Sequence, residues 1–107
     1  MKLSRVGWTL GKIASGNLSV YSFNDENQYN PITNIKETLN ELYGERVKFE
    51  KSHVEAIMMD EYFQEVYIDG VHFNIGDEFG IITFMTYEEG GNKYIKQIAE
   101  KLKAIGE

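Results

Sequence analysis

"EVYIDGVHFNI", residues 65–75, is the stretch that decides the fold. Two runs of alternating apolar and polar residues flank Asp69-Gly70, a dipeptide typical of the two-residue type I′ turn of a β-hairpin. Such a turn fixes the pairing of the strands, so Ile68 lies opposite Val71 and the register continues outward from there. The register predicts a core-facing side with Val66, Ile68, Val71 and Phe73, and an outer side with Glu65, Tyr67, His72 and Asn74.

Two segments outside this hairpin have helical spacing. In "NPITNIKETLNELYG", residues 30–44, Asn30 can cap a helix, Pro31 suits its first position and Gly44 suits its end. In residues 92–105, the apolar positions recur every three or four residues, as on one face of an amphipathic helix. These apolar positions are Ile95, Ile98, Ala99, Leu102 and Ile105.

The remaining apolar runs indicate strands. Residues 6–13 and 18–23 form a first predicted hairpin around the turn "SGN", with Tyr21 and Phe23 on one face. From residue 46 the period becomes two, and the sequence leaves open whether 46–59 is one bulged strand or two. Residues 81–87 are β-branched and aromatic on both faces, as expected for a central strand.

The predicted order is therefore ββ-α-βββββ-α within one domain, residues 1–107. Consecutive strands favour an α+β fold with a mainly antiparallel sheet of about five to seven strands. Two amphipathic helices are expected to cover one face of this sheet, with Ile35, Leu39, Ile98 and Leu102 packing on Ile82 and Phe84.

Between the last two strands, "GDEFG" (residues 76–80) is expected to be a polar turn from which Phe79 returns to the core. Burial is also favoured for Tyr87. For Tyr62 and Tyr67 the sequence leaves two interpretations open, a half-buried sheet residue or an anchor for a partner protein.

The charge distribution indicates which kinds of partner the chain can bind. The net charge is −6, and residues 52–92 contain nine acidic residues and no Lys or Arg. Such a segment repels nucleic acid backbones and anionic membranes and attracts basic partners. The chain has no cysteine, no apolar run of membrane-spanning length and no apolar core of a signal peptide near its start. We therefore expect a cytoplasmic protein without disulfides.

The chemistry-bearing residues do not form a recognised catalytic or metal-binding pattern. His72 is expected beside Tyr67 on the outer side of the hairpin, a cross-strand pair that stabilises hairpins without chemistry. His53, the other histidine, has no spacing to His72 that is typical of a zinc site, and the acids around Asp77 do not follow a calcium-loop pattern. We expect no metal, no cofactor and no enzyme activity.

The segment "VYIDGVHFNIGDEFGIITFMTYEEGGNKYIKQIAEKL", residues 66–102, resembles the C-terminal part of small immunity proteins from bacterial polymorphic-toxin systems. The shared features are an Asp-Gly hairpin, a turn rich in glycine and acids, a strand and a closing helix. The resemblance implies an acidic single-domain protein that blocks a toxin, often a basic nuclease, by covering its active site.

Sequence and resemblance together predict an inhibitor that binds a basic protein through an acidic face bearing tyrosines. The predicted partner-binding residues are Asp60, Glu61, Tyr62, Glu65, Tyr67, His72, Asn74, Asp77 and Glu78. Two other classes stay open, a small α+β enzyme or ligand-binding domain with an unrecognised pocket, and an acidic regulator that mimics DNA. The sequence leaves the oligomeric state and the identity of the partner open.

Overall fold

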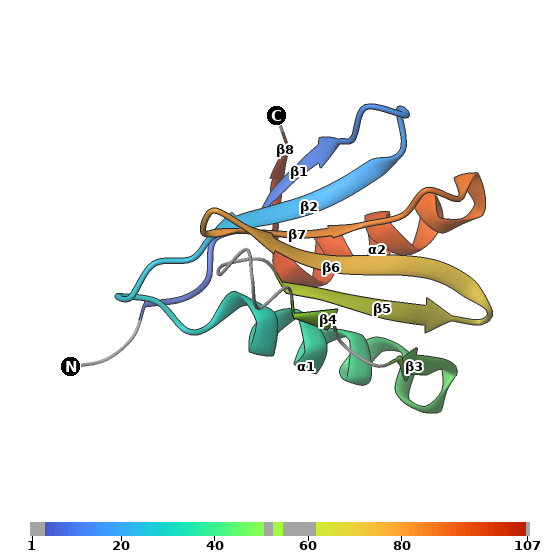
Figure 1. The fold of residues 1–107 in the computed structure, drawn as a ribbon, viewed down its shortest axis with the longest axis horizontal. Helices are drawn as coiled ribbons and strands as arrows, with labels where there is room; N and C mark the ends of the chain where they lie inside the picture. The colour runs from blue at the N-terminus through green and yellow to red at the C-terminus, as the bar shows by residue number, and fades with distance from the viewer. Residues whose placement is uncertain (1–3, 51–52, 55–61, 107) are drawn as a thin grey trace.

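A computed structural model describes residues 4–50, 53–54 and 62–106 (Figure 1). Its elements follow the predicted order, with one short strand added at the C-terminus. They are β1 (Thr9–Lys12), β2 (Leu18–Phe23), α1 (Pro31–Tyr43), β3 (Val47–Phe49), β4 (His53–Val54), β5 (Tyr62–Ile68), β6 (Val71–Glu78), β7 (Ile81–Met85), α2 (Asn92–Leu102) and β8 (Ile105–Gly106).

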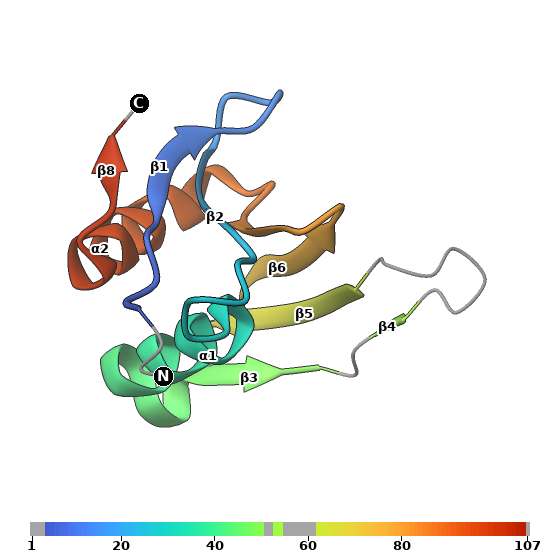
Figure 2. The same cartoon turned by 90° about the vertical axis from the view of Figure 1, so that its left-hand side faces the viewer.

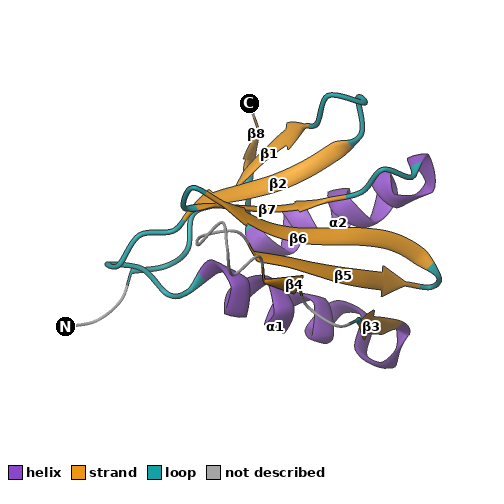
Figure 3. Cartoon of the chain, in the orientation of Figure 1, coloured by secondary structure: helices purple, strands orange, loops and turns teal. Residues whose placement is uncertain are grey.

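The strands form one mixed sheet in the order β3-β5-β6-β7-β2-β1-β8, with β4 also paired to β5. All pairs are antiparallel except that of β1 with β8. Both described helices lie on the same side of this sheet (Figures 2 and 3). The fold is therefore α+β, as predicted.

The register predicted for the β5–β6 hairpin is confirmed. Ile68 pairs with Val71, and the pairing continues through Val66 with Phe73. Asp69 and Gly70 have φ values of 53° and 84°, the left-handed conformation that a type I′ turn requires at both positions. Val66, Ile68 and Phe73 are completely buried and Val71 is partly buried against the same core, so the predicted core-facing side is confirmed as well.

The core lies between the sheet and the two helices. Phe73 stacks on Phe84 with ring centroids 5.2 Å apart. Phe73 and Tyr94 of α2 pack edge to face, with ring centroids 5.8 Å apart. The predicted helix residues contribute to the same cluster of buried side chains. This cluster includes Ile35, Leu39, Ile82, Ile98 and Leu102.

Helix α1 begins and ends where the sequence predicts. The side chain of Asn30 accepts a hydrogen bond of 2.8 Å from the backbone N–H of Ile32, and Pro31 occupies the first position. Gly44 ends the helix at a φ of 54°. A 3-10 turn at Gly44–Arg46 then leads into β3.

Strands β3 and β4 both pair with β5, which answers part of the question about residues 46–59. Phe49 lies opposite Val66, whereas His53 lies opposite Phe63. Four steps along the β3–β4 side thus match three steps along β5. The structure therefore has two short strands, β3 and β4, whose registers on β5 differ by one residue, and residues 51–52 and 55–59 lie outside the described part of the chain.

The C-terminal helix is shorter than predicted. We expected Ile105 on its apolar face, but Lys103 adopts a φ of 56° and ends α2 at Leu102. The N–H of Ala104 then bonds to the carbonyl of Ala99 at 2.9 Å, and that of Ile105 bonds to Trp8 at 3.0 Å. Ile105 is therefore part of β8, and its side chain is 75% exposed.

The prediction for "GDEFG" is wrong in its boundaries and in its aromatic residue. Strand β6 continues to Glu78, because Gly76 still pairs with Thr83 of β7. The turn consists of Phe79 and Gly80 alone, with φ values of 52° and 81°. The tight turn directs the Phe79 side chain away from the core, and it is 89% exposed.

The predicted burial of Tyr87 is also wrong, because its side chain is 64% exposed. It follows the end of β7, where the chain leaves the sheet for α2. The first predicted strand is likewise shorter, since β1 spans Thr9–Lys12 rather than residues 6–13. Val6 and Trp8 nevertheless belong to the core from outside the strand.

Candidate functional site

The candidate site is the face of the sheet opposite α1 and α2, which we call the open face. Strand alternation and register decide which side chains it carries. One row across the sheet runs from Phe63 through Gly76 and Thr83 to Tyr21. The neighbouring rows add Glu65, Asn74, Met85 and Ser19 on one side, and Glu78, Ile81 and Phe23 on the other.

The open face is hollowed by a groove of about 670 Å³. Its aromatic and apolar lining includes Tyr21, Phe63, Phe79 and Met85. Gly76 lies opposite Phe63 in the same row, and a Cβ at this position would be in contact with the Phe63 ring at 3.4 Å. The alternation of β2, β5 and β7 thus builds a groove wide enough to receive side chains of another molecule.

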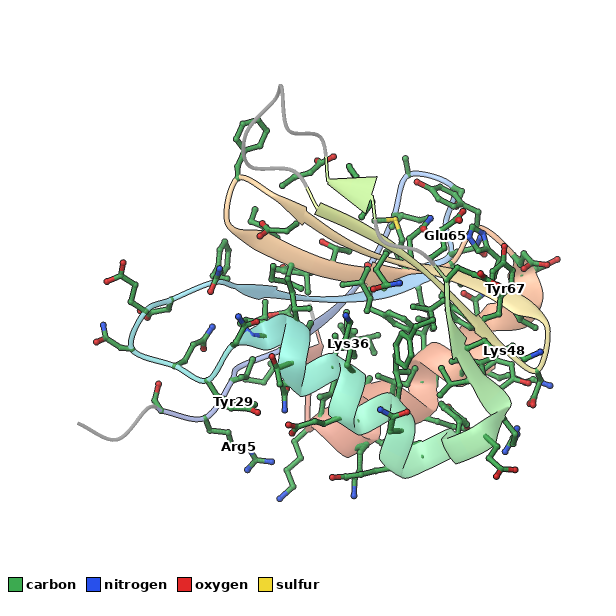
Figure 4. All side chains as sticks on the ribbon, turned by 60° about the horizontal axis from the view of Figure 1, so that its bottom comes forward. Arg5, Tyr29, Lys36, Lys48, Glu65 and Tyr67 are labelled. Atoms are coloured by element: carbon green, nitrogen blue, oxygen red, sulfur yellow. The ribbon has the colours of Figure 1, made fainter. Side chains whose placement is uncertain are left out.

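Tyr67 and His72 lie together at one end of the open face. Their ring centroids are 5.0 Å apart, and Nε2 of His72 is 3.4 Å from Oε1 of Glu65. Figure 4 shows Glu65, Tyr67 and Lys48 beside one another on neighbouring strands. These groups form a mixed polar and aromatic surface.

The backbone around His72 is held by residues that follow β7. The hydroxyl of Thr86 donates a 2.9 Å hydrogen bond to the carbonyl of His72, and the N–H of His72 donates to the carboxylate of Glu88. Within the described residues, no group of three or more His, Cys, Asp or Glu side chains could hold a metal ion. The described interactions of His72 include those with Tyr67, Glu65, Thr86 and Glu88.

Asp69 is separate from this surface, because the fold pairs it with a base from outside the acidic segment. Nε of Arg46 lies 2.8 Å from Oδ1 of Asp69, and the hydroxyl of Tyr94 donates to Oδ2 at 2.7 Å. The hydrogen bond from Arg46, followed by that from Tyr94, holds the pKa of Asp69 well below its usual range. This carboxylate connects the hairpin turn to α2 and to the 3-10 turn that precedes β3.

The other acids of the 52–92 segment are also placed by strand alternation. Asp77 pairs with Ile82 and therefore belongs to the helix-facing side of β6, whereas Glu78 is exposed on the open face. Glu65 and Glu78 are thus the acids that the described strands of this segment place on the open face. Asp60 and Glu61 lie outside the described residues, as does the side chain of Tyr62.

The structure therefore brings Glu65, Tyr67, His72 and Asn74 together, as predicted, and adds an aromatic groove that was not predicted from the sequence. The clearest missed residues are Phe63, Phe79 and Met85. The sequence does contain an indication of Phe79, because Phe79 and Gly80 stand between two apolar runs, where a two-residue hairpin turn is expected. Phenylalanine is an unusual residue at that position, where Asn or Gly is preferred.

Comparison with known proteins gives no match: no family model, curated protein or solved structure is similar enough to identify a relative. The helices described here are also too short and too polar to cross a membrane. Function must therefore be argued from the open face itself.

Proposed function

We propose that this chain is a cytoplasmic inhibitor that binds a basic protein, a cognate toxin domain, through the open face and covers its active surface. The observation that carries the proposal is the groove of about 670 Å³, aromatic in its lining, on the face of the sheet opposite both helices. The resemblance of residues 66–102 to immunity proteins agrees with it.

The chemistry of the open face suits a protein partner. Tyrosine and phenylalanine rings give large contact areas at low entropic cost, and they are typical anchors at the centre of interfaces. Tyr21 and Phe63 line the groove and are partly buried, while Tyr67 lies outside the groove on the same face of the sheet. Glu65 and Glu78 carry negative charge near these rings and favour the approach of a basic surface.

Association should therefore depend on charge at the open face. We expect Glu78→Lys to slow the association with the toxin domain by roughly 3-fold to 10-fold at low salt, and the difference should shrink at 1 M salt, where the Debye length is only ~3 Å. Stopped-flow measurements with the purified toxin domain from the same cells test this.

Glu100→Lys is the matched control, because it makes the same charge change at an exposed position of α2. Its association rate should stay closer to that of the wild type. Equal slowing by both variants would mean that only net charge matters, and no slowing by either would mean that the open face does not steer the partner.

The size of the groove supports a second candidate, a domain that binds a small apolar ligand. Ligand pockets have volumes of about 300–1,000 Å³ and mostly apolar linings. NMR screening of apolar fragments distinguishes the two functions. If a fragment binds with sub-millimolar affinity and changes the chemical shifts of Met85 and Thr83 alone, the ligand-binding function is favoured. If no fragment does so and the basic domain binds tightly, the inhibitor function is favoured.

A further inference from the structure

Phe79, an aromatic residue on the open face, has a backbone conformation that is unfavourable for its residue type. Phe79 has a φ of 52° and is followed by Gly80 at 81°, so it occupies the first position of a two-residue hairpin turn. At this position Asn, Asp and Gly adopt the left-handed conformation at lower cost than a bulky side chain. The ring does not offset that cost by packing, because the side chain is 89% exposed.

Phe79 is also part of a wider apolar surface. Glu78 pairs with Ile81, and Ile81 pairs with Phe23, so these residues form one row across β6, β7 and β2. Phe23 is 64% exposed and Ile81 is 37% exposed. We call Phe23, Phe79 and Ile81 the aromatic end of the open face.

Acidic residues border the aromatic end. Glu78 precedes the turn and is exposed, and Asp25 and Glu26 are exposed in the loop that follows β2. The N–H of Asn24 donates a 2.7 Å hydrogen bond to the carbonyl of Gly80, which holds this loop against the turn. Figure 1 shows the end of β2 and the β6–β7 turn at the same end of the sheet.

We infer that Phe79 is the anchor of the partner interface, and that it inserts into an apolar socket bordered by Lys or Arg on the basic protein. This inference rests on the proposed function and adds the chemistry of the surface that is recognised. An exposed ring held at an unfavourable turn position is what an anchor requires, since it enters the complex with little rearrangement. The acidic border selects a cationic socket, and it opposes pairing with a second copy because like charges would meet.

Two substitutions of Phe79 distinguish the effect of its ring from the effect of its backbone conformation in the turn. Phe79→Ala removes the ring but keeps a side chain that disfavours a positive φ, so its melting temperature should stay near that of the wild type. Phe79→Asn removes the ring and suits the turn, so its melting temperature should rise by roughly 2–5 °C. A clear fall in melting temperature for both variants would overturn the inference, because it would show that the ring stabilises the fold.

Binding to the basic toxin domain completes the test. Both variants should dissociate at least roughly 30-fold faster than the wild type, the effect of a strong anchor. Ile105→Ala, which alters another exposed apolar side chain on β8, should dissociate at the wild-type rate. Binding to polylysine, a probe of charge alone, should be the same for Phe79→Ala and the wild type.

The outcomes separate this inference from the proposed function. If the domain binds and Glu78→Lys slows its association while Phe79→Ala dissociates normally, the inference fails and the proposed function stands. If substitutions across the whole open face leave binding unchanged, the proposed function fails. Sedimentation that shows a wild-type dimer dissolved by Phe79→Asn would identify a second copy as the occupant and overturn the inference.

Discussion

Asp69 shows how one residue can have two structural roles. Its left-handed φ of 53° makes the hairpin turn, and its carboxylate accepts hydrogen bonds from Arg46 and Tyr94. The sequence predicts the first role from the Asp-Gly pair. It does not predict the second, because Arg46 is 23 residues away along the chain and comes close only when β3 pairs with β5.

Asp69→Asn tests the second role, since asparagine also suits the turn. The pKa of Asp69 is lowered in the folded protein, chiefly by Arg46, so its charge favours folding above the ordinary aspartate pKa of about 3.9. That contribution is lost as the pH falls through the lowered value. We expect Asp69→Asn to melt below the wild type at pH 7, and the difference to shrink below about pH 4.

Thermal unfolding followed by circular dichroism from pH 2 to pH 8 measures this difference. A gap between the two proteins that stayed constant across the range would mean that the charge of Asp69 does not stabilise the fold.

At the scale of the element, the β5–β6 hairpin was predictable because its turn fixes its register and one-sided burial fixes its faces. The β6–β7 hairpin was less predictable. Its turn has the same left-handed geometry, but Phe79 replaces the Asp or Asn that normally indicates it. The groove could not be predicted either, because it depends on how β2, β5 and β7 are placed relative to one another in the sheet.

Phe73 is the central residue of the β5–β6 hairpin. It is fully buried and contacts Phe84 and Tyr94, so Phe73→Ala should leave a cavity and lower the free energy of unfolding by about 3–5 kcal/mol. Urea denaturation measures the loss. Phe23→Ala, an exposed control on β2, should change it by less than about 0.5 kcal/mol. Equal losses would contradict the assignment of the two faces.

The connection from β7 to α2 depends on a close contact. A Cβ added to Gly91 would lie 2.5–2.8 Å from the side chain of Thr86, which is fully buried and bonded to the carbonyl of His72. Gly91→Ala should therefore lower the free energy of unfolding by about 1–3 kcal/mol.

Gly90→Ala is the matched control for Gly91→Ala, because a Cβ there meets nothing within 4 Å. It should change the free energy of unfolding by less than about 0.5 kcal/mol in the same denaturant titration. Similar results for the two alanines would mean that Thr86 is not packed as closely as described.

At the scale of the whole molecule, the charge of a segment differs from the charge of a surface. Residues 52–92 have a uniform sign in the sequence, but in the fold Asp69 pairs with Arg46 and Asp77 turns to the helix-facing side. The sequence therefore overestimated how many of these acids share one face. What it could predict was the α+β architecture, since strand order and amphipathic helices follow from local patterns.

The central claim is that a basic partner docks on the open face, and Thr83→Arg tests it most directly. Thr83 lines the groove on the central strand β7, so an arginine there should fill the groove and repel a basic surface. Thr33→Arg makes the same change at an exposed position of α1. Isothermal titration with the basic toxin domain should show at least roughly 10-fold weaker binding, about 1.4 kcal/mol, for Thr83→Arg alone. A folded Thr83→Arg that binds as tightly as the wild type would contradict the claim.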